Sequence, residues 1–182
     1  MPVTTDPSAA CRILIYGVTG SGKSTAAKRI AARTGLPVTL VDELTWMPGW
    51  VPVAEDQQRY LIAEIASKDR WVLDTAYGAW LDLVVPRAQL IIALNYPRWF
   101  SLQRLLRRTL LRAIDQQTIC NGNTQSWRGL YGKHSIVRWH FKSFARKRDR
   151  IRAWADAVEG PPVLFIRRPR DLESCLPLFV ER

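Results

Sequence analysis

Apolar and polar positions divide the first third of this chain into a strand, a turn and a helix. The run CRILIYG, from Cys11 to Gly17, is rich in branched residues and ends in glycine, which predicts a buried strand. The segment from Lys23 to Arg33 combines strong helix formers with an apolar face, which predicts a helix. Gly35 and Pro37 should end that helix.

The same alternation continues along the chain. Four further apolar runs predict strands at 37–42, 71–74, 89–96 and 162–168. Helical patterns predict helices at about 55–67, 97–114, 135–158 and 169–176. Strands that alternate with helices form a parallel sheet that is covered on both faces. The pattern therefore predicts an α/β fold of three layers, α/β/α, with a five-stranded parallel sheet.

One polar stretch interrupts this pattern. Between the helices at 97–114 and 135–158 the residues are mostly polar and include glycines, so we interpret about 113–133 as a short lid or mobile loop. A length of 182 residues suits a single domain, 1–182. No apolar run approaches the ~18 residues of a membrane span, so we expect no membrane partner and a cytoplasmic location. The three cysteines lack metal-ligand spacing, and we expect reduced thiols and no zinc.

The turn after the first strand carries the strongest motif in the chain. The segment GVTGSGKS satisfies GxxxxGK[ST] at every fixed position. Its glycines let the backbone curl with the N–H groups inward around phosphates, and the following helix directs its positive N-terminus at the same place. The motif therefore predicts a nucleoside triphosphate, expected to be ATP with Mg²⁺. The residues expected to bind it are Gly17, Thr19, Gly20, Ser21, Gly22, Lys23, Ser24 and Thr25.

The motif and one later acid suggest individual roles. Lys23 should reach the β and γ phosphates, Ser24 should offer its hydroxyl to Mg²⁺, and Thr25 should contact the α phosphate. Asp74 ends the strand WVLD, where ligands of parallel sheets collect, and we assign it to Mg²⁺ through water. A capping acid in a turn is the alternative. Asn95, at the end of the run QLIIALNY, is a poorer partner for Mg²⁺.

Other charged residues suit the acceptor side of a phosphoryl transfer. Asp42 and Glu43 are expected to end the second strand, where either can orient or deprotonate an acceptor hydroxyl. A solvated acidic turn is the alternative for both. Arginines can stabilise charge on the migrating phosphoryl group, although any single one can instead be solvated. The candidates are Arg104, Arg107, Arg108 and Arg112, followed by Arg128 in the expected lid.

The net charge of +11 adds a second possibility, because such a charge attracts phosphate-bearing partners. Between Arg98 and Arg152 the chain has 14 bases against two acids, which concentrates the charge in one region. Aromatic residues are interleaved with these bases, as in proteins that bind nucleic acid. The aromatic residues in question are Trp139, Phe141 and Phe144.

Several segments together resemble one family. GVTGSGKST, VDELTWMPGW, WVLDTAYG, LIIALNYPRWFSLQRLLRR and FIRRPRDLESCL resemble small bacterial adenylate-kinase-like proteins that are often labelled DNA topology modulation proteins. The resemblance runs from about Arg12 to Leu176 and implies a nucleoside monophosphate kinase-like P-loop fold with a short lid. The chain departs from that family at Thr75 and Asn95, where the family tends to have Gly and Asp.

The resemblance also implies site residues. Asp74 matches the acid of the family's third strand, Arg104 and Arg108 match arginines that precede its lid, and Arg170 is implied to lie near the adenine. With the motif, these residues favour a kinase that transfers the γ-phosphate of ATP to a small molecule or nucleotide, which the sequence does not identify. A nucleotide-regulated nucleic-acid-binding protein and a simple ATPase are the alternatives. The expected catalytic residues are Lys23, Asp42, Asp74, Arg104 and Arg108.

Overall fold

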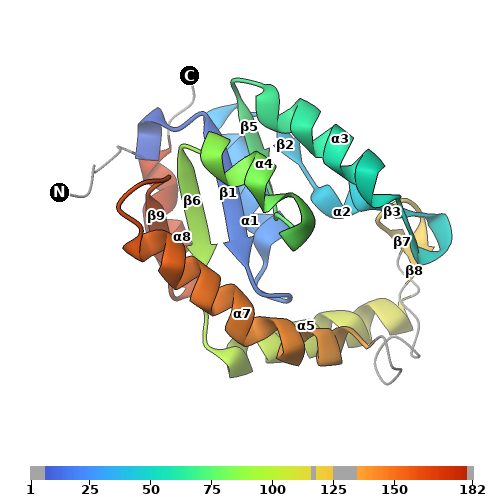
Figure 1. The fold of residues 1–182 in the computed structure, drawn as a ribbon. Helices are drawn as coiled ribbons and strands as arrows, with labels where there is room; N and C mark the ends of the chain where they lie inside the picture. Colours follow the sequence, from blue (N-terminus) through green and yellow to red (C-terminus); the bar gives the residue numbers. More distant parts are fainter. Residues whose placement is uncertain (1–6, 116–117, 125–134, 180–182) are drawn as a thin grey trace.

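The chain forms one parallel sheet with helices on both faces (Figure 1). The computed structural model describes residues 7–115, 118–124 and 135–179. The five strands lie in the order β2-β5-β1-β6-β9, and every neighbouring pair is parallel. The predicted five-stranded parallel sheet is therefore confirmed. Its strands are β1 (Arg12–Gly17), β2 (Val38–Thr39), β5 (Trp71–Leu73), β6 (Leu90–Leu94) and β9 (Val163–Ile166).

Helices cover the sheet because its central strand is apolar on both faces. Ile13 and Ile15 of β1 pack in one core with α1 (Lys23–Thr34) and α8 (Pro169–Cys175). Leu14 and Tyr16 pack in a second core with α3 (Glu55–Ser67), α4 (Leu81–Val84) and α7 (Ile136–Asp156). A strand buried on both faces has no polar face, which explains its continuous apolar run. Further helices are α2 (Val41–Thr45) and α5 (Arg98–Ile114). Among the described residues, no helix has the length and apolar character of a membrane span.

The second predicted strand is wrong beyond Thr39. The chain leaves the sheet after the two residues of β2, and α2 begins at Val41. The backbone N–H of Val41 donates to the Asp74 carboxylate at 2.9 Å, which holds the chain in a new direction. Asp42 and Glu43 consequently lie in the first turn of α2 and not at the end of a strand. Their negative charges suit a helix N-terminus.

The expected lid is replaced in part by regular structure. Helix α5 continues to Ile114, past the predicted start of the lid at 113. A small antiparallel hairpin follows, formed by β7 (Thr118–Ile119) and β8 (Asn123–Thr124). A second hairpin, formed by β3 (Trp46–Met47) and β4 (Val51–Pro52), lies in the connection between α2 and α3. Residues 116–117 and 125–134, with Arg128, lie outside the described residues, and the lid function stays a prediction.

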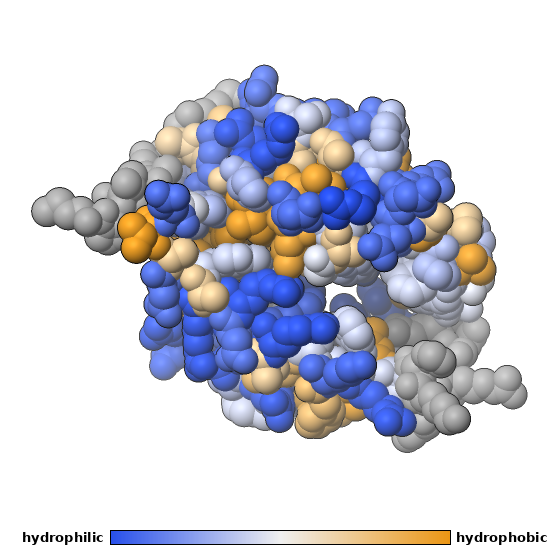
Figure 2. All heavy atoms as spheres, in the orientation of Figure 1, coloured by the Kyte–Doolittle hydropathy of each residue, from blue (hydrophilic) through white to orange (hydrophobic). Residues whose placement is uncertain are grey.

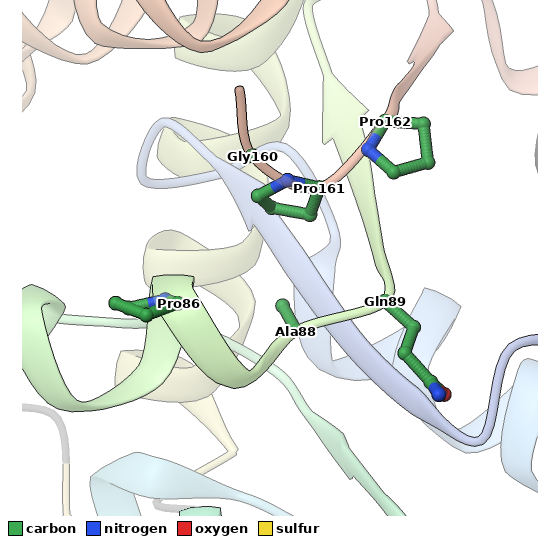
Figure 3. A pocket seen from close by; sticks show the side chains of 6 residues that line it. All are labelled: Pro86, Ala88, Gln89, Gly160, Pro161 and Pro162. Carbon is green, nitrogen blue, oxygen red and sulfur yellow. The ribbon is translucent and has the colours of Figure 1, made fainter. Parts of the chain in front are cut away.

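A shallow pocket of about 300 Å³ lies at the edge of the sheet where β6 and β9 begin (Figure 3). Gln89 lines it, but its side-chain oxygen accepts hydrogen bonds from the backbone N–H groups of Cys11 and Arg12, at 2.8 and 3.1 Å. No lining residue is ionisable, so this pocket offers little chemistry. The lining residues are Pro86, Ala88, Gln89, Gly160, Pro161 and Pro162. The GxxxxGK[ST] motif and Asp74 lie at the opposite edge of the sheet, where β1 and β5 end.

Candidate nucleotide-binding site

The phosphate loop joins β1 to α1 in the predicted position and is packed tightly. Gly20 and Gly22 both have left-handed backbones, with φ of 83° and 91°. A Cβ atom at Gly20 would lie 2.4 Å from the carbonyl oxygen of Ser101 and 2.8 Å from Cβ of Leu105, both in α5. Gly22 is the N-cap of α1, so the helix directs its positive end into the loop. The loop therefore has the backbone of an anion site.

Lys23 lies between the loop and two acids. Its Nζ donates to the carbonyl oxygen of Val18 at 3.2 Å. Burial lowers the pKa of Lys23, while the charges of Asp42 and Asp74 oppose that change and the charge of Arg108 adds to it. The ammonium group is thus placed beside the loop, where the phosphates are expected.

Ser24 and Asp74 are joined directly by a hydrogen bond. The Ser24 hydroxyl donates to Oδ2 of Asp74 at 2.6 Å, and the carboxylate, with the residue 3% exposed, uses Oδ1 to accept from Val41. Burial raises the pKa of Asp74, and these two hydrogen bonds oppose the rise. Asp74 therefore caps α2 and also faces the loop. A hydroxyl and a carboxylate fit Mg²⁺, which prefers oxygen ligands.

The two acids of α2, Asp42 and Glu43, have different surroundings. The hydroxyl of Tyr77 donates to the carboxylate of Asp42, and the charge of Asp42 opposes the lowering of the pKa of both Lys23 and Arg108. Burial raises the pKa of Cys120 in the β7–β8 hairpin, and the charges of both Asp42 and Glu43 add to the rise. Of these two acids, Asp42 is the one whose charge also acts on Lys23 and Arg108. Asp42 is consequently the acid of α2 that lies with the loop.

The arginines of α5 also fall into two groups. A Cβ atom at Gly22 would lie 3.2 Å from Nη2 of Arg104, which places that guanidinium against the loop. Burial lowers the pKa of Arg108, with Arg112 and Arg104 adding to the decrease and Asp42 opposing it. The spacing of four residues puts these three arginines on one face of the helix. Arg107 lies off that face and is exposed.

Several solved structures with a similar fold are kinases. They are a gluconokinase from Sinorhizobium meliloti 1021 (17% identity, 91% of this chain and 87% of that chain, TM-score 0.51) and a shikimate kinase from Bacteroides thetaiotaomicron (15%, 93% and 96%, TM-score 0.54). A deoxyadenosine kinase from M. mycoides is also similar (12%, 91% and 96%, TM-score 0.50). The fold is that of the P-loop NTPases. No protein-family model and no curated protein matches the sequence, so the resemblance to DNA topology modulation proteins stays a prediction.

The P-loop fold brings most, but not all, of the predicted residues together. Ser21 is buried in the loop, and Thr25 is exposed in the first turn of α1. Thr19 uses its carbonyl oxygen to accept from His140 of α7. Arg170 is exposed in the first turn of α8, and within the described chain no hydrogen bond or ion pair joins its side chain to the loop. Its place near the adenine stays a prediction.

The hairpin after α5 is attached to the segment that carries Asp42. The thiol of Cys120 donates to the carbonyl oxygen of Asp42 at 3.0 Å, and the amide of Asn121 donates to the carbonyl oxygens of Glu43 and Trp46 at 2.7 and 2.8 Å. In Figure 1, β7 and β8 accordingly lie beside β3. Figure 2 shows the surface hollowed between this region and the α5–α7 pair. The hollow lies at the carboxyl edge of the sheet.

Sequence reasoning missed residues of α7 that contact the P-loop. His140 and Lys147 donate to loop carbonyl oxygens, but the sequence shows them only as one histidine without a partner and one base among many. The spacing of seven residues, which puts both on one face, was the available signal. Phe144 shares that face and is 4% exposed, so it cannot stack on a nucleic-acid base. Trp139 and Phe141, the other two aromatic residues of that expectation, are 47% and 49% exposed, so nucleic-acid binding stays a prediction.

Proposed function

We propose that this chain is an ATP-dependent phosphotransferase that moves the γ-phosphate of ATP to a hydroxyl group of a small molecule. The observation that carries the proposal is the position of the Asp42 carboxylate, which accepts a hydrogen bond from the hydroxyl of Tyr77, three residues after Asp74. Its charge also favours the charged forms of Lys23 and Arg108. A carboxylate in that place can accept a hydroxyl proton, whereas it would repel a phosphate acceptor. The similar structures are named for gluconate, deoxyadenosine and shikimate, and each of these compounds has hydroxyl groups.

The donor half of the reaction rests on the P-loop. Its backbone N–H groups and the N-terminus of α1 favour the negative charge of the phosphates, and Lys23 supplies a positive charge beside them. Ser24 and Asp74 would hold Mg²⁺, which neutralises phosphate charge when it is bound. Arg104 lies close enough to Gly22 to contact the same phosphates.

The acceptor half rests on Asp42 and Arg108. The hydroxyl of Tyr77 holds one carboxylate oxygen of Asp42, which fixes the acid and leaves the other oxygen for the acceptor. Nε of Arg108 is buried and has no hydrogen-bond partner among the described residues. Such a guanidinium group can stabilise charge on the migrating phosphoryl group, because that step needs fixed positive charge more than covalent help.

Two measurements test the donor half. Lys23→Ala should abolish ATP binding in calorimetry and leave the far-ultraviolet circular dichroism unchanged. Lys28→Ala is the matched control, because Lys28 is exposed on the same helix. Unchanged ATP affinity of Lys23→Ala would remove the loop from the proposal.

The acceptor half is tested first with a screen of ATP consumption over sugar acids, nucleosides and nucleoside monophosphates. Consumption with monophosphates alone would refute a hydroxyl acceptor. With the best acceptor, Asp42→Asn should lower kcat by about 10²–10⁴-fold, the usual contribution of a general base, and should leave ATP affinity unchanged. Glu43→Gln is the matched control and should keep its activity. An equal loss in both variants would show that Asp42 has no special role.

A further inference from the structure

Helix α7 contacts the carbonyl oxygens of the P-loop, on the side away from the expected phosphates, through two buried side chains. Nζ of Lys147 donates to the carbonyl oxygen of Gly17 at 3.2 Å. Nδ1 of His140 lies 3.0 Å from the carbonyl oxygen of Thr19, and it must carry the proton because a carbonyl oxygen only accepts. His140 is 0% and Lys147 9% exposed. Both contacts therefore join α7 to the loop in a region without solvent.

These contacts fall where a phosphate-binding loop needs support. A loop whose N–H groups point inward at an anion turns some of its carbonyl oxygens outward, and a buried carbonyl oxygen without a donor is costly. Lys147 and His140 supply donors at the two ends of the turn that contains Val18. They consequently hold the loop in the shape that a triphosphate requires.

The charged groups around Lys147 are mostly of its own sign. Lys23, Arg146 and Arg150 disfavour its ammonium form, and Asp42 is the acid whose charge favours it. The ring of Tyr16 lies 5.6 Å from its Nζ, and His140 faces it from the same helix. Among the described residues no carboxylate forms an ion pair with Lys147. Burial and these cations lower the pKa of Lys147 to about 7.

A buried lysine with no acidic partner is stabilised by an anion that arrives later. The P-loop is the place where the proposed function puts such an anion, and Lys147 contacts its first glycine. We propose that Lys147 is a positioning residue of the donor site, and that binding of a triphosphate draws a proton onto its amine. The inference rests on the proposed function, since it requires that ATP binds at the loop.

The sign of the pH dependence follows from the charge of the ligand. In the free protein, Lys147 loses its proton as the pH rises through about 7. Bound phosphates favour the ammonium form and so raise its pKa. The affinity for ATP should therefore fall as the pH rises from 6 to 9. Bound phosphate also raises the pKa of Lys23 and His140. Both residues are present in the wild type and in Lys147→Gln, so the ratio of the two dissociation constants isolates the effect of Lys147.

The test measures the dissociation constant of Mg-ATP by calorimetry from pH 6 to pH 9. Lys147→Gln keeps a donor for Gly17 and removes the charge, and Lys142→Gln is the matched control from an exposed position of α7. We expect Lys147→Gln to weaken binding about tenfold at pH 6 and less than about threefold at pH 9, the size of one partly screened charge interaction. Lys142→Gln should stay within about twofold of the wild type at every pH, as a screened surface charge does.

The outcomes separate the possible roles. A loss that is equal at all pH values would mean that Lys147 acts by packing alone, and unchanged binding at pH 6 would overturn the proposal outright. If Lys147→Gln does not fold, Lys147→Arg decides, because a guanidinium group keeps its charge up to pH 9. A weaker pH dependence of Mg-ATP affinity in Lys147→Arg than in the wild type would support the proposal, and an unchanged pH dependence would overturn it. A wild type that binds no Mg-ATP would refute both this inference and the proposed function.

Discussion

Alanine substitutions at two glycines of the P-loop test how closely the loop packs against α5. Gly20 and Gly22 have similar left-handed backbones, with φ of 83° and 91°. Alanine at either position should lose about 1–2 kcal/mol of unfolding free energy, because Cβ is unfavourable there. The two sites differ in what the new Cβ meets. At Gly22 it meets the end of the flexible Arg104 side chain at 3.2 Å, which can move away.

At Gly20 the new Cβ meets the backbone of α5. The carbonyl oxygen of Ser101 is only 2.4 Å away, so the loop and the helix must separate. Overpacking of this kind costs about 1–3 kcal/mol, so Gly20→Ala should lose about 2–5 kcal/mol in total. Urea unfolding of both variants, followed by circular dichroism, measures the difference. Equal losses in the two variants would refute the close contact between the loop and α5.

Three further predictions concern other contacts. The pKa of Lys147 falls from 10.5 to about 7 on folding, so burying its ammonium group costs about 5 kcal/mol of unfolding free energy below pH 7. Lys147→Met removes that cost and should stabilise the protein most below pH 7 and progressively less toward pH 10.5, less the contribution of the lost hydrogen bond. Thermal melts at pH 6 and 9 measure this gain, and a larger gain at pH 9 would contradict it. At pH 8.5 less than about 1% of Cys120 should be thiolate, because burial and nearby acids raise its pKa to about 11, so iodoacetamide should modify it far more slowly than a cysteine peptide. Asn123→Ala removes the acceptor for the N–H of Trp50 at 2.8 Å and should lose about 1–3 kcal/mol in urea, whereas Thr124→Ala should lose little because Thr124 bonds Trp50 through its backbone.

Local sequence patterns were sufficient for the sheet and the loop. Strand β1 is apolar from Ile13 onward and β6 over its whole length because helices cover both faces, and such runs are visible without a structure. The motif from Gly17 to Ser24 was equally clear, because its glycines and lysine have fixed spacing. The error at α2 has a different origin. The helix begins where the Val41 N–H meets the carboxylate of Asp74, 33 residues later, and no local pattern records that contact.

The same limit applies to the bases of α7. Lys142 and Lys147 have the same chemistry and lie in the same basic helix, yet one is exposed and the other is 9% exposed under the P-loop. Which base is buried depends on how α7 packs against β1, and that packing is set by residues such as Ile151 in the second core. Sequence reasoning could therefore find the basic region and could not find the one lysine within it that contacts the loop.

The positions of the basic residues change which partner the net positive charge indicates. Arg104 lies against Gly22, Arg108 is half-buried near Asp42, and Lys147 lies under Gly17. These three side chains, together with Lys23, direct positive charge toward one loop, and a triphosphate is the anion that the proposed function places there. Part of the basic charge between Arg98 and Arg152 is thus accounted for by a small ligand. A nucleic-acid partner could use only the exposed remainder, and Phe144 is not available to it.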